Sequence, residues 1–298
     1  MIKRFFTIVI ITILAIFAFS ISDSMDAMSW PSENAALIRN FGTNDMGSPV
    51  LGMVFAGQTQ VLAAEAGEVI FSRNRNDTAS RLPSPFGAWT AIDHGDGLIT
   101  IYSRYDDNGV SSFLEQVERQ QPIAVSGTSG WSQQNGFYFL VFDRRERRWI
   151  NPAMIVTPLQ DTRAPQILSV TLRNAQGQVV QSNNLTQGRY TVIVNVAGGT
   201  VRPVAGSPVS NTQHAPLRIV CSVNGAEAGT LNFEAVSARD GTLMVYRNGL
   251  TPASRVYNPF PAFEAADVFL SRGQVSLEVI VQDITGATHN IVQRLTVN

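Results

Sequence analysis

The chain has few of the residues that hold metal ions or form disulfides. Among its 298 residues there are one cysteine and three histidines. A single cysteine cannot form a disulfide within the chain, so stability must come from apolar cores. Cys221 lies in a strand-like run, which predicts a buried side chain without reactivity. The histidines His94, His214 and His289 form no His-x-His and no His-x-x-x-Asp pattern. A catalytic zinc needs about three protein ligands, so no zinc site can be assigned.

A marked excess of charge of either sign is also missing. The net charge is -1, and 44% of the residues are hydrophobic. This balance gives no reason to expect nucleic acid as a partner. The length and composition are typical of a globular chain with about two domains.

One long apolar run stands out, and it is at the start of the chain. Lys3 and Arg4 precede apolar residues 5–19, and Ala18-Phe19-Ser20 offers a small-residue exit. This pattern predicts a signal peptide over residues 1–22 and an exported protein, periplasmic or associated with the cell envelope. The alternative is an uncleaved anchor, which would be the only membrane contact expected. The run is shorter than the roughly 20 residues of a typical span.

Residues 30–160 have the pattern of a domain of short antiparallel strands. The stretch 87–105 reads as a hairpin, with His94-Gly95-Asp96-Gly97 as its turn. The nearly continuous apolar run 137–143 predicts a central strand buried on both faces. A short helix is expected over 32–40, with Ser32 as its cap.

Residues 163–298 again show strands at regular spacing, separated by turn residues. The polar stretch 161–165, which ends in a proline, reads as a linker. The spacing favours an immunoglobulin-like β-sandwich, with 262–269 as a short helix or loop insertion. The predicted fold class is therefore all-β.

Five stretches in order carry a resemblance to a known family. They are 66–70 (AGEVI), 87–104 (GAWTAIDHGDGLITIYSR), 117–121 (VERQQ), 123–130 (IAVSGTSG) and 149–152 (WINP). Together they resemble the LytM-type domain of the M23 metallopeptidases, over about residues 40–158. The resemblance implies an antiparallel LytM/M23-like β-domain ahead of the sandwich. Members of this family are zinc endopeptidases that cut peptide cross-links in bacterial cell walls.

The sequence departs from the family at its metal site. The two ligand positions of the family's opening His-x-x-x-Asp segment match Val50 and Val54, and those of its His-x-His match Tyr138 and Leu140. The position of a further catalytic histidine matches Arg104. Valine and leucine offer no lone pair, so we expect no metal, no cofactor and no catalytic residue here.

Two further residue sets are open to a functional interpretation. Asp45, Asp93, Asp96 and Asp143 would suit calcium or magnesium better than zinc, but turn and surface roles are expected. The run 144–148 (RRERR) is either a solvated loop or a contact to an anionic partner.

The residues expected to contact a ligand in the groove of such a domain are few. They are His94, Tyr102, Arg104, Trp131 and Tyr138. His94 matches the family at a turn position that is not a zinc ligand. Arg104 could face a carboxylate of a bound wall peptide, or it could only fill the vacated site beside Tyr138.

These observations predict an exported protein with an M23-like domain that has lost catalysis. It would bind peptidoglycan or regulate a cell-wall hydrolase. One alternative is an active endopeptidase with relocated ligands, which would require zinc. Another is a structural envelope scaffold that docks partners through its sheet edges.

Overall fold

The computed structural model describes residues 27–73, 83–107, 114–132, 134–158, 164–198, 214–258 and 260–298. The predicted signal peptide lies outside these residues. In the described ranges, no helix has the length and apolar character to cross a bilayer. The helical residues described are two 3-10 turns, η1 (Pro152–Met154) and η2 (Ala253–Arg255). The expected all-β fold class is confirmed.

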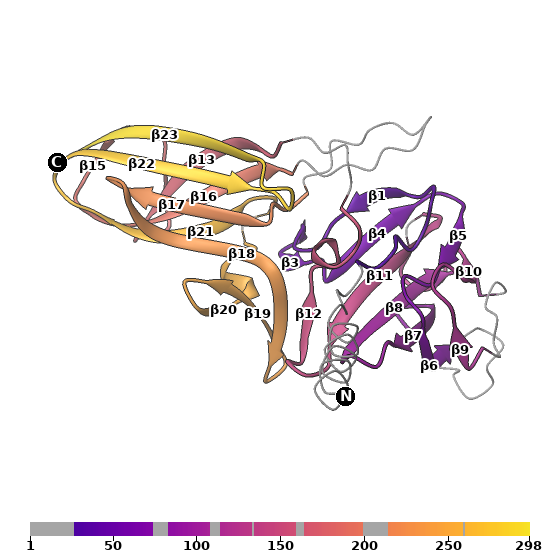
Figure 1. Ribbon diagram of the computed structural model, residues 1–298. Helices are drawn as coiled ribbons and strands as arrows, with labels where there is room; N and C mark the ends of the chain where they lie inside the picture. Colours follow the sequence, from indigo (N-terminus) through magenta and orange to yellow (C-terminus); the bar gives the residue numbers. More distant parts are fainter. Residues whose placement is uncertain are drawn as a thin grey trace, which may run out of the picture.

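The first domain is built on an antiparallel sheet with the strand order β1-β4-β11-β8-β7-β6-β9 (Figure 1). A smaller pair, β5 and β10, lies beside it, and β2 and β3 form a short hairpin. The strands of this domain are β1 (Ala36–Arg39), β2 (Asn44–Asp45), β3 (Ser48–Pro49), β4 (Gly52–Ala56), β5 (Gln60–Leu62), β6 (Gly67–Arg73), β7 (Ala88–Asp93), β8 (Leu98–Tyr105), β9 (Gln116–Val117), β10 (Pro122–Val125), β11 (Gly136–Asp143) and β12 (Arg148–Ile150).

Strand β11 is central and is buried on both faces, as its apolar run predicts. Phe137, Phe139 and Val141 enter the main core of the domain, where the Phe137 ring stacks on Phe55 with centroids 4.7 Å apart. Tyr138 and Leu140 point to the opposite face and belong to a separate apolar cluster. Successive residues of a strand face opposite sides, so the alternation follows from the pleat.

The second domain is a sandwich of two sheets. One sheet has the order β14-β13-β16-β21, and the other contains β15-β23-β22-β17-β18 with β19 and β20 (Figure 1). A core of apolar residues, including the fully buried Cys221, lies between them. The immunoglobulin type stays a prediction. The strands are β13 (Gln166–Asn174), β14 (Val179–Val180), β15 (Asn184–Leu185), β16 (Gly188–Ala197), β17 (Arg218–Val223), β18 (Ala226–Arg239), β19 (Thr242–Arg247), β20 (Leu250–Pro252), β21 (Phe263–Leu270), β22 (Gly273–Gln282) and β23 (Thr288–Val297).

Two expectations about local helix are wrong. The segment expected to be helical over 32–40 contains strand β1, which pairs with β4. Ser32 still caps a turn, because its Oγ accepts a hydrogen bond from the backbone N–H of Ala35 at 3.2 Å. The stretch 262–269 is almost wholly strand β21, paired with β16. In both cases pairing with a distant strand overrides a weak local preference.

The two domains share one sheet through β18. The first half of this 14-residue strand pairs with β17 in the sandwich. Its second half pairs with β12 of the first domain, where Trp149 lies opposite Val236. In Figure 1, β18 runs along the sandwich and then bends down beside β12. The backbone hydrogen-bond ladder therefore passes from one domain to the other.

The segment 40–50 joins the domains a second time. Phe41 has no exposed surface and is part of the sandwich core, although it belongs to the N-terminal half of the chain. The Tyr257 hydroxyl donates a hydrogen bond to the carbonyl of Gly42 at 3.0 Å. Asn40 exchanges hydrogen bonds with the backbone of Ala215. The first domain is thus joined to the second near its start, through residues 40–42, and near its end, through β12.

Candidate functional site

The residues that match the family's metal positions lie together in space. Val50, Tyr138 and Leu140 form one apolar cluster, and Val54 packs against it. The strand register explains the proximity, because Tyr138 on β11 lies opposite Val54 on β4. Leu140 is 1% exposed and Tyr138 is 8% exposed. We call this group the apolar cluster; it brings together the side chains that the sequence resemblance matches to the family's metal ligands.

Leu51 and Trp149 close the apolar cluster from the side of the second domain. Both side chains pack against the apolar cluster and also against the sandwich core. Phe86 and Ile101 complete the cover. Tyr138, which was expected to contact a ligand in the groove, is therefore covered by its neighbours, and so is Leu140.

Tyr138 is held in place through its hydroxyl group. Its hydroxyl oxygen accepts a hydrogen bond from the backbone N–H of Leu51 at 2.8 Å. Burial raises the pKa of the Tyr138 phenol above its ordinary value, which the hydrogen bond from Leu51 and the positive charge of Arg104 oppose. The phenol therefore stays protonated and is a poor metal ligand.

Arg104 is the extra residue of a β-bulge in β8. Ala88 pairs with Tyr105 and Trp89 pairs with Ser103, so Arg104 has no opposite residue. Its φ is +65°, in the left-handed region, and its N–H donates to the Phe86 carbonyl at 2.8 Å. The guanidinium carbon lies 5.0 Å from the centre of the Tyr138 ring. Bulges beside functional sites commonly redirect a side chain in this way.

The charge around Arg104 is only partly balanced. Burial lowers the pKa of Arg104, and Asp45 and Arg39 act on it electrostatically with opposite signs. Asp45 is already engaged, since its carboxylate pairs with Arg39 at 2.7 Å. An arginine remains charged after any such shift. Among the residues that the structure describes, Arg104 therefore has no carboxylate paired with it.

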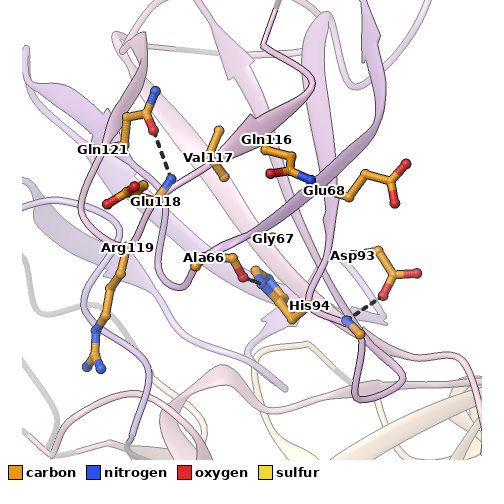
Figure 2. Close-up of a pocket in the computed structure, with 11 residues that line it drawn as sticks. Ala66, Gly67, Glu68, Asp93, His94, Gln116, Val117, Glu118, Arg119 and Gln121 are labelled. Atoms are coloured by element: carbon orange, nitrogen blue, oxygen red, sulfur yellow. Dashed lines mark hydrogen bonds between the residues drawn. The ribbon is translucent and has the colours of Figure 1, made fainter.

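His94 is not part of the apolar cluster and lies in the turn between β7 and β8. Figure 2 shows it in an open depression of about 940 Å³ that also holds Glu68, Asp93 and Arg119. Its Nδ1 is 2.7 Å from the Ala66 carbonyl oxygen, so Nδ1–H is the donor. Its Nε2 is 2.8 Å from the Thr100 hydroxyl. With both ring nitrogens engaged, His94 ties the hairpin turn to the start of β6.

Two other expected ligand-contacting residues have different surroundings. Tyr102 is fully buried in the core, and its hydroxyl oxygen accepts from the N–H of Ala64 at 2.7 Å. Tyr102 faces the main core, on the opposite side of the sheet from Tyr138. Because it is fully buried there, it has no surface to offer a ligand. Trp131 is 74% exposed, in a loop whose backbone bonds the Pro85 carbonyl.

The aspartates serve in turns and ion pairs. Asp96 accepts from the N–H of Leu98, and Asp93 accepts from the N–H of Gly95 and pairs with Arg144 at 2.9 Å. Asp143 caps the turn after β11 by accepting from the N–H groups of two following residues. Within the part of the chain that the structure describes, no three His, Cys, Asp or Glu side chains form a group that could hold a metal.

The basic run 144–148 forms the turn of the β11–β12 hairpin. Arg145 and Arg147 are exposed there, and Arg148 lies near Asp143 with a nitrogen–oxygen distance of 3.5 Å. Two of the five side chains, those of Arg144 and Arg148, thus pair with aspartates inside the domain. Contact with an anionic partner stays a prediction.

The buried tyrosines give a prediction for high pH. Burial raises the pKa of Tyr102 to about 12 and also raises those of Tyr105, Tyr138 and Tyr257. Phenols of the unfolded chain ionise near pH ~10, so above that pH the unfolded state binds fewer protons than the folded state. Stability should therefore fall as the pH rises from about 10 toward 12.

The measurement for this prediction is the phenolate absorbance during an alkaline titration. At about pH 11, four of the six tyrosines should contribute little phenolate signal until the chain unfolds. The same titration in concentrated urea should show all of them ionising together. Full ionisation of the folded chain at about pH 10 would contradict the burial described above.

Comparison with protein families bears out the resemblance of the first domain to the M23 peptidases. The family model described as "Peptidase family M23" matches residues 49–152. A second family model, which carries no description of function, matches residues 164–298. No curated protein matches the chain significantly.

Several solved structures are similar in part. The SpoIIQ–SpoIIIAH pore-forming complex contains a chain with 21% identity and a TM-score of 0.36; the match covers 45% of this chain and 92% of that one. The catalytic domain of the prophage-encoded M23 protein EnpA from Enterococcus faecalis has 17% identity and a TM-score of 0.33, with coverages of 43% and 93%. Lysostaphin from Staphylococcus simulans has 13% identity and a TM-score of 0.33, with coverages of 90% and 98%.

Proposed function

We propose that the chain, whose residues 49–152 are an M23 peptidase-like domain, is an exported, non-catalytic protein that binds peptidoglycan. The observation that carries the proposal is the apolar cluster. Val50, Val54 and Leu140 occupy ligand-equivalent positions and have no lone pair to give a metal. The proposal therefore depends on which side chains are present, and a shift in their positions would not create metal ligands.

Relocated ligands would be needed for hydrolysis, and the described residues offer none near the apolar cluster. Asp45 acts electrostatically on Tyr138 of the apolar cluster, but its carboxylate is paired with Arg39. Tyr138 keeps its proton, and His94 uses both ring nitrogens elsewhere. Water activation by a metal needs an open coordination position among at least three donors.

Wall binding is favoured over a purely structural role because a partly exposed cation remains. Arg104 and the exposed Trp131 both donate backbone hydrogen bonds to the segment 85–86, so a cation and an exposed aromatic side chain belong to neighbouring parts of the domain. A domain that binds a ligand without cleaving it needs residues that contact the ligand, but it needs no metal ligands. A wall hydrolase is the second partner to test, because regulation of such an enzyme would use the same residues.

The test combines metal analysis, wall digestion and wall binding on the purified protein. We expect no stoichiometric zinc, no release of soluble peptides from purified sacculi with or without added zinc, and co-sedimentation with the sacculi. Stoichiometric zinc together with wall cleavage would instead support an active endopeptidase with relocated ligands. Absence of co-sedimentation, with stimulation of an added wall hydrolase, would replace peptidoglycan by the hydrolase as partner; absence of both would favour the scaffold.

A further inference from the structure

Arg104 has a buried hydrogen-bond donor that no described residue uses. Its Nε is buried and makes no hydrogen bond to any residue in the described ranges. In the described part of the chain the guanidinium forms no ion pair, because Asp45 is taken by Arg39. A buried donor without a partner costs free energy unless something outside the chain completes it. The fold therefore keeps a guanidinium at this position at a cost in free energy.

The backbone at this position makes the choice of arginine costly. At a φ of +65°, Arg104 occupies the left-handed region that glycine enters without strain. Glycines do take this conformation at other turns of the chain, such as Gly95 at +80°. The left-handed backbone at Arg104 therefore adds a local free-energy cost at the bulge.

The guanidinium is also oriented. It lies over the Tyr138 ring at 5.0 Å, and Tyr138 is fixed by its hydrogen bond from Leu51. Stacking holds the plane of an arginine and leaves its edges free for a planar, two-oxygen acceptor. A carboxylate matches that fork, whereas a phosphate dianion would face the negative charge of nearby Asp45 with one free guanidinium to balance it.

Aromatic side chains continue the surface beside Arg104. Phe86 bonds Arg104 through its carbonyl, and its ring centroid lies 6.2 Å from that of Trp89. Trp89 stacks on Phe71 at 4.1 Å, and Phe71 is 44% exposed. We call Phe86, Trp89 and Phe71 the aromatic track. Its partly exposed rings would cover the apolar portions of a ligand whose charged end reaches Arg104.

We propose that Arg104 binds a free carboxylate of a cell-wall peptide through two parallel N–H···O hydrogen bonds, with the peptide lying along the aromatic track. The inference rests on the proposed wall binding and names the group that is recognised. Because Nε itself is buried, the carboxylate meets the terminal amino groups of the partly exposed guanidinium, and it supplies a negative charge that the described residues of the site do not contain.

The experiment measures binding of soluble wall peptides, released from sacculi by a muramidase, to the full chain by calorimetry. Arg104→Gly should weaken binding by about 10- to 100-fold, the loss expected for a charge-assisted bidentate pair. Its melting temperature should not fall, because glycine relieves the left-handed backbone. Arg104→Lys should recover part of the affinity. Peptides whose carboxyl groups have been amidated should bind the wild type as weakly as unmodified peptides bind Arg104→Gly.

The matched control is Gln120→Gly. Gln120 also has a positive φ of +65°, but its side chain is uncharged and exposed. This variant should bind wall peptides like the wild type. Equal binding by Arg104→Gly and the wild type, or equal binding of amidated peptides, would overturn the carboxylate site while leaving wall binding intact. Failure of the wild type to bind sacculi at all would instead remove the proposed function, and this site with it.

Discussion

Replacing Phe41 with alanine is expected to lower the free energy of unfolding by about 3–5 kcal/mol, the range for removing a buried aromatic side chain. Phe41 has no exposed surface and fills part of the sandwich core from outside that domain. The cavity would open where the domains join, so the loss should affect the whole chain. Urea unfolding followed by circular dichroism measures the change.

The control for Phe41→Ala is the same substitution at Phe269. Phe269 is 55% exposed on β21, so its removal should change stability by no more than about 0.5 kcal/mol. If the two variants unfolded at the same urea concentration, the position of Phe41 in the sandwich core would be wrong.

Replacing Asn44 with alanine is expected to cost about 2–4 kcal/mol, because it leaves buried acceptors without donors. The Asn44 amide donates to the carbonyls of Tyr257 and Ala262 at 2.8 and 2.9 Å. Its Oδ1 accepts from the N–H of Gly47 at 3.0 Å. Asn44 therefore holds the β2–β3 hairpin against the second domain.

Asn44→Asp separates hydrogen bonding from shape. Aspartate has nearly the same volume but cannot donate when ionised, so it should destabilise about as much as alanine. Asn290→Ala is the control, since its side chain makes an exposed hydrogen bond to Glu278 at 3.0 Å. An Asn44→Asp variant as stable as the wild type would show that the donated hydrogen bonds are unimportant. Thermal unfolding of the three variants gives the comparison.

The local parts of the fold could be predicted from the sequence. The Asp-Gly turn between residues 93 and 98 and the apolar run of β11 each carry a signal within a few neighbours. The error at residues 32–40 has the same origin. A short segment with a capping serine favours helix locally, but pairing of β1 with β4 supplies more hydrogen bonds.

The joining of the domains could not be predicted, because it depends on contacts that are distant in sequence. Strands β12 and β18 each look like ordinary strands, and nothing in either indicates that Trp149 lies opposite Val236. Phe41 likewise reads as one apolar residue before a turn.

The candidate site was predictable in its chemistry and not in its shape. The absence of lone-pair donors at Val50, Val54 and Leu140 can be read from the letters alone. The left-handed backbone of Arg104 cannot, because arginine gives no signal for positive φ. The cover over Tyr138 depends on Leu51 and Trp149, whose positions are set by the second domain.

The strand shared by the two domains also decides how the chain can be dissected. A fragment that stops before residue 164 would lose β18, and the backbone N–H and C=O groups of β12 would face water along a new sheet edge. Trp149 and Leu51 would lose their packing against the sandwich at the same time. Open edges beside apolar side chains recruit other chains, so self-association of the isolated fragment would reflect the cut and not the native protein.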